Sequence, residues 1–260
     1  MVTMKKYEDH QFSFIVTCYN FEKYITECLD SLVCQNYKRE NYEVICIDDG
    51  STDNSVQIIE KYRRSFENFS MIRMHNSGLE KACNIGIEAS RFGWIVRVDS
   101  DDRVDINFLS VINRKMNQRP EYDFYYCKNY FEYFSENERY KKSLPDFDIE
   151  EIFERGDFFA TGTVYKKSDL KEIGFFPEAV KNCGLENYSV ILALLAKNKK
   201  GLAVPGTWFD YRRHHTNMSI LKRQAIVEFG HKLLAFYERP FLTNENHPYQ
   251  LKFEAEEQKT

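Results

Sequence analysis

The chain has 260 residues, 43% of them hydrophobic and 29% charged, an ordinary globular composition that can build a sizeable core. Its net charge of -4 argues against a nucleic-acid-binding protein, which usually carries a basic face. Seven cysteines without paired short spacings indicate reduced thiols. No apolar run approaches the ~20 residues that cross a bilayer, and the polar N-terminus lacks a signal-peptide core. We therefore expect a cytoplasmic protein with no nucleic-acid partner.

The first 118 residues alternate short apolar runs with helical patterns. The apolar runs predict buried strands at 12–17, 42–47, 70–74 and 94–98. Apolar residues at helical spacing predict helices at 22–35, after residue 53 and at 79–89. A repeated strand–helix order is typical of an α/β fold whose parallel sheet is covered on both faces.

The second half of the chain is less regular. The patterns predict one long strand or a hairpin at 123–134, a strand at 161–166, a helix at 186–197, an extended segment at 208–212 and an amphipathic helix at 220–237. We expect these elements to form a smaller lobe or cover over the edge of the sheet.

Three carboxylates, Asp99, Asp101 and Asp102, directly follow the fourth predicted strand. In an extended segment Asp99 and Asp101 share a face, and hard oxygen ligands suit Mg²⁺ or Mn²⁺. A bound cation would also offset the repulsion between the two charges. A solvated turn that caps the next helix is the alternative. An EF-hand is excluded, because Val104 and Ser110 stand where its Gly and Glu are required.

A second acidic pair, Asp48 and Asp49, ends another strand at the same predicted edge of the sheet. Ligands bind at the carboxyl ends of parallel strands. A carboxylate there can accept a hydrogen bond from a nucleobase N–H, and the ring of Tyr19 can stack on the base. Together with the metal pair, these residues indicate a site for a nucleotide diphosphate.

The same segments resemble a known family over residues 12 to 118. FIVTCYN, CLDSLVCQNY, EVICIDDGSTDNS, GLEKACNIGIEAS and WIVRVDSDD match, in order and spacing, the nucleotide-binding half of family 2 glycosyltransferases with the GT-A fold. Shorter similarities follow in VYKKSDLKEIGFF, LENYSVILALLAKN and DYRRHHTNMS. The resemblance implies a Rossmann-like, mostly parallel sheet flanked by helices, with a smaller C-terminal acceptor-side region.

The resemblance also implies an activity and a division of the chain. The expected reaction transfers a sugar, with inversion, from a nucleotide-diphosphate sugar (UDP by family habit) to an acceptor hydroxyl in surface polysaccharide or glycolipid synthesis. Residues 1–118 would bind the nucleotide sugar, 119–218 would form the acceptor-binding and catalytic half, and 219–260 a helical segment and tail. A saccharide or lipid-linked saccharide acceptor would bring the protein to the inner face of the cell membrane. The 220–237 helix is a candidate for that contact, with a packing helix as the alternative.

Several binding residues are implied by position in the family pattern. Thr17 and Tyr19 should line the base pocket, and Asp49 should bind the base. Asp99 should lie near the ribose or the metal. Asp101 should be the main protein ligand of a divalent cation, Mn²⁺ or Mg²⁺.

The family usually places its catalytic base, an acidic residue, at the start of a helix in the second half. Here that segment offers only Glu186, because Asn187 and Ser189 stand where carboxylates are common and neither can act as the base. The alternative role for Glu186 is a favourable charge in a first helical turn. Asp157 is the reserve candidate.

Two further positions concern the diphosphate. Cys83 replaces an arginine that is common in the family, so Lys81 becomes the candidate for that contact, and His214 matches a histidine expected near the diphosphate. A nucleotidyltransferase is disfavoured because residues 17–20 lack a Gly-rich phosphate loop. The departures at 83, 187 and 189 keep open a catalytically impaired nucleotide-sugar-binding or regulatory protein.

Overall fold

The computed structural model describes residues 7–155 and 161–237. Its strands are β1 (Phe12–Cys18), β2 (Tyr42–Asp48), β3 (Phe69–Arg73), β4 (Trp94–Asp99), β5 (Arg103–Val104), β6 (Phe124–Ser135), β7 (Glu138–Ser143), β8 (Val164–Lys166) and β9 (Gly201–Arg212). Its α-helices are α1 (Ile25–Val33), α2 (Ser55–Ser65), α3 (Leu79–Ala89), α4 (Phe108–Gln118), α5 (Ile149–Arg155), α6 (Lys167–Glu172), α7 (Glu186–Ala196), α8 (Met218–Leu221) and α9 (Arg223–Phe236). A short 3₁₀ turn covers Arg39–Asn41.

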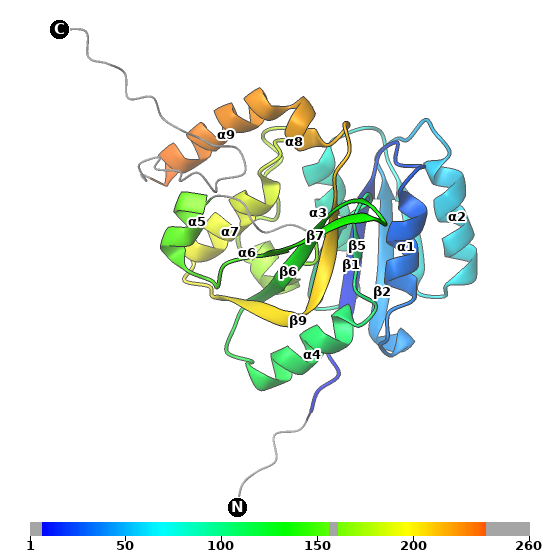
Figure 1. Cartoon of the computed structure of the whole chain (residues 1–260), viewed down its shortest axis with the longest axis horizontal. Coiled ribbons are helices and arrows are strands. Elements are labelled where there is room, and N and C mark those ends of the chain that lie inside the picture. Colours follow the sequence, from blue (N-terminus) through cyan, green and yellow to red (C-terminus); the bar gives the residue numbers. More distant parts are fainter. Residues whose placement is uncertain (1–6, 156–160, 238–260) are drawn as a thin grey trace, which may run out of the picture.

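The described strands form one mixed sheet in the order β3-β2-β1-β4-β8-β6-β9-β5, with β7 paired to β6. The strands β3, β2, β1 and β4 run parallel, as does the β6–β9 pair. Helices flank the sheet, with α1 in front of it and α3 behind it in Figure 1. The expected α/β fold is therefore confirmed.

The parallel strands are buried because helices cover both faces. Every residue of β1 and β2 is buried, in keeping with their continuous apolar runs. Gly86 lets α3 approach the sheet closely, since a Cβ at this position would lie 2.6 Å from side-chain atoms of Ile15 and Ile47. This contact fixes α3 behind the two central strands.

The register of the parallel strands brings their carboxyl ends together. Cys18 of β1 lies opposite Asp48 of β2, and Thr17 lies opposite Asp99 of β4. The two acidic strand ends therefore flank the end of β1, as the strand order predicts.

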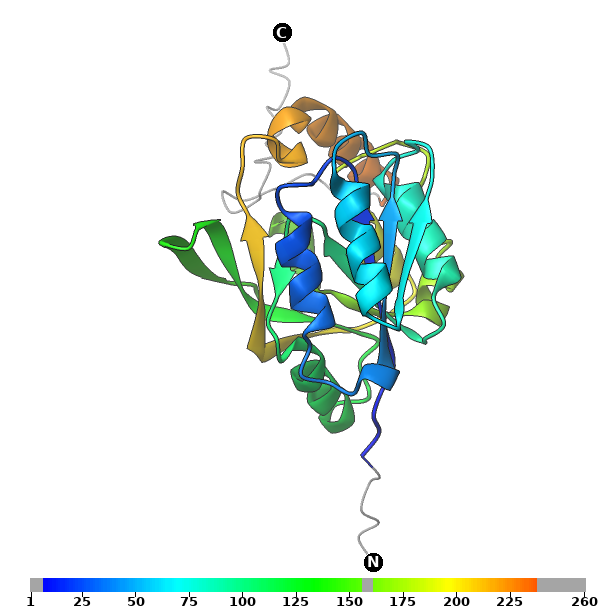
Figure 2. The same ribbon diagram turned by 90° about the vertical axis from the view of Figure 1, so that its right-hand side faces the viewer.

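The second half of the chain extends the same sheet. Antiparallel pairing of β4 with β8, and of β8 with β6, joins the two halves edge to edge. The run at 123–134 is a single strand, β6, which then forms a hairpin with β7 that projects from the body of the molecule (Figure 2). The extended segment at 208–212 is the end of a much longer strand, β9.

The acidic segment departs from the extended conformation that its sequence suggests. Strand β4 ends at Asp99, and the chain turns so that the Asp102 amide donates to the Asp99 carbonyl at 3.0 Å. Ser100, expected to point away, is buried in the turn. Asp99 and Asp101 are therefore placed by a turn and not by strand alternation.

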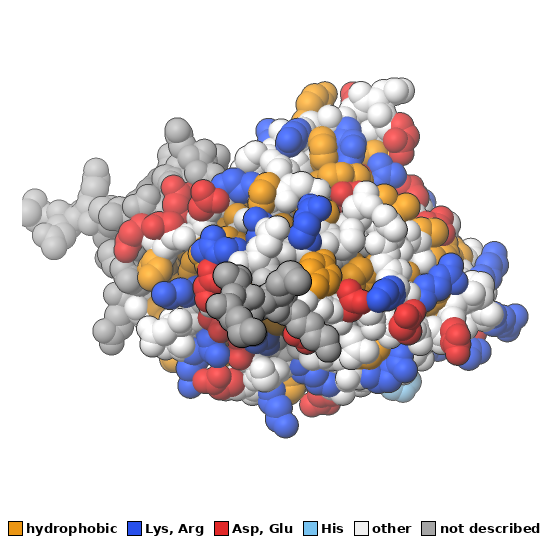
Figure 3. Space-filling view, turned by 90° about the horizontal axis from the view of Figure 1, so that it is seen from below, with side chains coloured by type: hydrophobic (Ala, Val, Ile, Leu, Met, Phe, Trp, Pro, Cys, Tyr) orange, Lys and Arg blue, Asp and Glu red, His pale blue; other side chains and the backbone are white. Residues whose placement is uncertain are grey.

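The predicted helix at 220–237 is broken into α8 and α9 at Lys222. In Figure 1 both helices lie beyond the carboxyl ends of the central strands. In the described part of the chain, no helix combines the length and the apolar character that a membrane span requires. On the face that Figure 3 shows, acidic and basic side chains are interspersed.

Candidate active site

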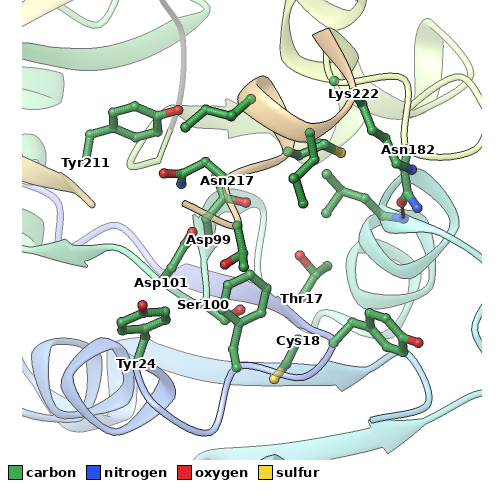
Figure 4. A pocket seen from close by; sticks show the side chains of 18 of the residues that line it. Thr17, Cys18, Tyr24, Asp99, Ser100, Asp101, Asn182, Tyr211, Asn217 and Lys222 are labelled. Atoms are coloured by element: carbon green, nitrogen blue, oxygen red, sulfur yellow. Dashed lines mark hydrogen bonds between the residues drawn. The ribbon is translucent and has the colours of Figure 1, made fainter. Parts of the chain in front are cut away.

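A cavity of about 980 Å³ opens at the carboxyl ends of β1 and β4, and both halves of the chain contribute to its wall. Six of the residues expected at the site line it: Thr17, Tyr19, Asp49, Asp99, Asp101 and Glu186. In Figure 4 the turn from Asp99 to Asp101 faces this space, with Thr17 to its right in the view, Tyr24 below it, and Tyr211 and Lys222 above it.

Asp101 is held by a histidine from the end of the sheet. Its Oδ2 lies 2.9 Å from Nε2 of His214. The imidazole ring stacks on Tyr24 with 4.8 Å between ring centroids, and its Nδ1 lies 2.7 Å from Thr216 Oγ1. These contacts fix the orientation of the histidine ring and place it beside the Asp101 carboxylate.

Asp102 has a different environment from its two neighbours. Its carboxylate accepts hydrogen bonds from Thr161 Oγ1 at 2.6 Å and from the Arg212 amide at 2.9 Å. Burial and the charges of the other two aspartates raise its pKa well above the usual value. Asp102 is 1% exposed. Through its hydrogen bond from the Arg212 amide, it holds β9 against the acidic turn.

Arg97 connects Asp99 with Glu186. Its guanidinium donates to both carboxylate oxygens of Asp99, at 2.6 and 3.2 Å, and its Nη2 lies 3.0 Å from Glu186 Oε1. Burial raises the pKa of Asp99 and of Glu186, while the charge of Arg97 acts in the opposite direction on both. The arginine therefore compensates two carboxylates at once, the buried Glu186 and the partly exposed Asp99.

Glu186 is the first residue of α7 and lines the cavity. It is 5% exposed, and its Oε2 has no hydrogen-bond partner among the described residues. A buried carboxylate with one unpartnered oxygen and a raised pKa is well suited to accept a proton.

Asp49 supports the wall of the cavity through the backbone. Its two carboxylate oxygens accept the amides of Ser77 and Gly78, at 2.6 and 2.9 Å. Gly78 has a φ of 105°, which a side chain would strain. Asp49 thus orders the turn before α3 as well as facing the cavity.

Lys81 and His214 are not among the residues that line this cavity, although His214 contacts Asp101, which lines it. Lys81 is exposed on α3 and lines a separate depression together with Lys181. Asp157 lies outside the described residues. Cys83 is fully buried beside Arg97, and burial raises the pKa of its thiol to about 12.

Arg97 was missed as a site residue, although the sequence carries a signal for it. A charged residue inside the apolar run WIVRVD must find a partner when the strand is buried on both faces. The partners themselves, one on the same strand and one on α7, follow only from the three-dimensional fold.

The acidic turn fits a divalent cation by the chemistry of its donors. Asp99 and Asp101 present hard oxygen atoms to the cavity. Ser100 Oγ, between them, is buried without a hydrogen-bond partner. An orphaned oxygen between two carboxylates suits the hydration shell of Mg²⁺ or Mn²⁺.

A second group of ligand-type side chains includes Glu186. Ligand atoms of Glu80, Cys183 and Glu186 lie within 4.8 Å of one another. The carboxylate of Glu80, however, accepts the amides of Asn182 and Cys183 at 2.8 and 2.7 Å. Glu80 therefore anchors the segment before α7 to α3.

The fold and the site together define an α/β protein with a cavity at an acidic strand end. A family model, glycosyl transferase family 2, matches residues 13–174. The chain belongs to this family, as the sequence resemblance predicts.

A curated relative covers most of the chain. The minor teichoic acid biosynthesis protein GgaA of Bacillus subtilis is 29% identical over 230 residues, which is 82% of this chain and 49% of that protein. The chain spans at most about half the length of the curated relatives that it matches.

Two solved structures share the fold. S. aureus TarS in complex with UDP-GlcNAc has a TM-score of 0.69 and 22% identity, covering 86% of this chain and 66% of that one. The mannosyltransferase PcManGT of Pyrobaculum calidifontis, in complex with GDP-Man and Mn²⁺, has a TM-score of 0.68 and 15% identity, covering 90% and 65%. These similarities confirm the expected GT-A fold.

Proposed function

We propose that this protein is a metal-dependent, inverting glycosyltransferase that uses a nucleotide-diphosphate sugar, with UDP as the nucleotide. One observation carries the proposal: Glu186 and the Asp99–Asp101 turn, which are 85 residues or more apart in sequence, line one cavity. A candidate base and a candidate diphosphate site thus face the same space.

The reaction assigns distinct roles to the two sides of the cavity. Glu186 Oε2 accepts the proton of the acceptor hydroxyl while the hydroxyl oxygen bonds to the anomeric carbon of the donor sugar. The bond from the anomeric carbon to the diphosphate oxygen breaks, and its electron pair leaves with UDP. Attack from the face opposite the leaving group inverts the configuration.

On the donor side, residues 1–118 bind the nucleotide. Tyr19, 44% exposed at the cavity wall, presents a ring on which the base stacks, and Thr17 lines the cavity from the position opposite Asp99 in the sheet. Asp49 accepts from the base, since each of its oxygens has a second lone pair beyond its backbone contact. Asp99 takes the ribose.

Asp101, with Asp99, would hold Mn²⁺ or Mg²⁺, and His214 is the partner that orients the Asp101 carboxylate. The bound cation would stabilise negative charge on the leaving diphosphate. Mn²⁺ is present in the PcManGT complex, which supports a divalent cation here.

On the acceptor side, residues 119–218 provide the wall, and the helices α8 and α9 follow it in the chain. Tyr130 and Tyr211 line the cavity from β6 and β9. A saccharide packs well on such rings. The relative GgaA, named for teichoic acid synthesis, supports a surface polymer as the acceptor.

A lipid-linked acceptor would place the reaction at the inner face of the cell membrane, with the protein in the cytoplasm. Exposed apolar side chains on α8 and α9 support such a contact: Ile220, Leu221 and Phe236 are 57%, 67% and 78% exposed. Lys222 and Arg223 directly follow Ile220 and Leu221 in the chain. Apolar side chains beside cations are typical of a segment that rests on an anionic membrane.

The test is a donor-hydrolysis screen over nucleotide sugars with Mn²⁺, Mg²⁺ or EDTA. It compares the wild type with Asp101→Ala and Glu186→Ala, and with Glu88→Ala, which removes an exposed carboxylate of α3, as the control. We expect metal-dependent release of UDP that both site variants lose and the control retains.

Other outcomes would contradict the proposal. Donor binding without turnover on any acceptor would indicate a binding or regulatory protein. Full turnover by Asp101→Ala would show that the cation is bound elsewhere or is not required.

A further inference from the structure

Arg97 is a charged residue inside a buried parallel strand, and it lies at the wall of the cavity. It is 2% exposed and lies opposite Ile15 of β1 on the face that α3 covers. A buried guanidinium is tolerated only when carboxylates compensate its charge. Here two carboxylates from different elements do so, Asp99 from the end of β4 and Glu186 from α7.

The geometry divides the oxygens of Glu186 into two kinds. Oε1 lies 3.0 Å from Arg97 Nη2, whereas Oε2 is buried and unpartnered. Because the guanidinium is a rigid planar fork already fixed by both oxygens of Asp99, it also fixes Oε1. With Oε1 fixed, the rotation of the carboxyl group and hence the direction of Oε2 are set.

We propose that Arg97 is a positioning residue that aims Glu186 Oε2 at the acceptor hydroxyl and ties its orientation to the donor-side Asp99. This inference rests on the proposed function. The neighbouring residue on α3, Cys83, lies beside the guanidinium and is fully buried. The positive charge beside Asp99 and Glu186 is therefore supplied by Arg97 of β4 and not by residue 83 of α3.

The first variant to measure is Arg97→Lys, which keeps the positive charge but replaces the fork with a point charge. Two quantities are compared with the wild type: kcat for UDP release from a UDP-sugar with Mn²⁺, and the Kd of UDP by calorimetry. We expect kcat to fall roughly tenfold to a hundredfold, since misaiming a reacting group by about an ångström has effects of that size. The Kd of UDP should change by a smaller factor.

Arg91→Met is the matched control. Arg91 also pairs with a buried carboxylate, Glu43, but neither residue lines the cavity. If the loss of any arginine–carboxylate pair were sufficient to lower kcat, Arg91→Met would lower it as Arg97→Lys does. We expect it to leave kcat unchanged, whatever it does to the melting temperature.

Relocation of the guanidinium tests the geometry directly. Arg97→Met should lose more activity than Arg97→Lys, and the double variant Cys83→Arg/Arg97→Met should recover at least about tenfold of kcat, because a side chain from 83 reaches the vacated space. Thermal melting and UDP binding establish that each variant is folded.

The outcomes separate this inference from the proposed function. A wild type that releases no UDP from any nucleotide sugar overturns both. An active wild type with unchanged kcat in Arg97→Lys overturns only the positioning role. A loss in UDP affinity that equals or exceeds the loss in kcat would assign Arg97 to the donor through Asp99 alone.

Discussion

Nε2 of His214 lies 2.9 Å from Oδ2 of Asp101, although the two residues are 113 positions apart in the chain. The imidazole is stacked on Tyr24, so it cannot turn away from the carboxylate without losing that packing. This contact joins the segment that follows β9 to the acidic turn that follows β4. It makes His214 the partner that fixes how Asp101 faces the cavity.

Substitution of His214 should weaken metal binding without removing a metal ligand. We expect His214→Ala to lower the affinity for Mn²⁺ in the presence of UDP by about 10- to 100-fold, the usual effect of losing a partner of a ligating carboxylate. Calorimetric titration with Mn²⁺ measures this affinity. His75→Ala, at an exposed position, is the control, and an equal effect in both variants would remove His214 from the site.

Tyr19 should contribute to nucleotide binding through its ring and not its hydroxyl. We expect Tyr19→Ala to raise the Kd of UDP roughly tenfold, because stacking of a base on an aromatic ring is worth about 1–3 kcal/mol. Tyr19→Phe should bind as the wild type does. Equal weakening in the two variants would instead assign the contact to the hydroxyl group.

The pH dependence of turnover should report the raised pKa of Glu186. Burial disfavours its charged form, so a higher pH is needed to deprotonate it than the ~4.3 of an ordinary glutamate. Since a base must be deprotonated to act, kcat/KM should fall with decreasing pH at an inflection above that value. An acidic limb at or below the ordinary value would contradict this role.

Asp102 and Asp101 should differ in what they do for stability. Asp102→Ala leaves the Thr161 hydroxyl and the Arg212 amide without their acceptor, which should lower the free energy of unfolding by roughly 1–3 kcal/mol. Asp101→Ala should change it less, while abolishing metal-dependent turnover. Urea unfolding of the two variants measures the difference, and similar unfolding midpoints would show that Asp102 is not the structural member of the triplet.

The first half of the fold was predictable because local signals and long-range pairing agree there. The helix at 79–89 and the strands at 42–47 and 94–98 follow directly from apolar patterns, and strand order alone placed Asp49 and Asp99 at one edge. The second half was less predictable, because β8 is only three residues long and β9 pairs with two strands that are far from it in sequence, β6 on one side and β5 on the other. The amino-acid pattern of the second half therefore reflects the strands that pair with one another more than any local β-strand propensity.

Within the site, the roles of the three aspartates needed the structure. Sequence spacing could identify the acidic triplet. The turn at Ser100, however, gives a different set of buried side chains from the one that strand alternation would give. The position of Lys81 shows the same limit, since one turn of α3 decides whether a residue faces the cavity or solvent. The partnership of Arg97 with Glu186 joins residues 89 positions apart, a separation that no periodicity describes.

The hydrogen bond from the Arg212 amide to Asp102, together with the pairing of β5 with β9, has a consequence for how the protein folds. These contacts join residues more than 100 positions apart, so closing them is entropically expensive and slow. A nascent chain can assemble β1 to β4 and still lack the contacts that shape the acidic turn. We expect the donor site to mature only after β9 has been synthesised and docked, so that an incomplete chain does not sequester nucleotide sugar.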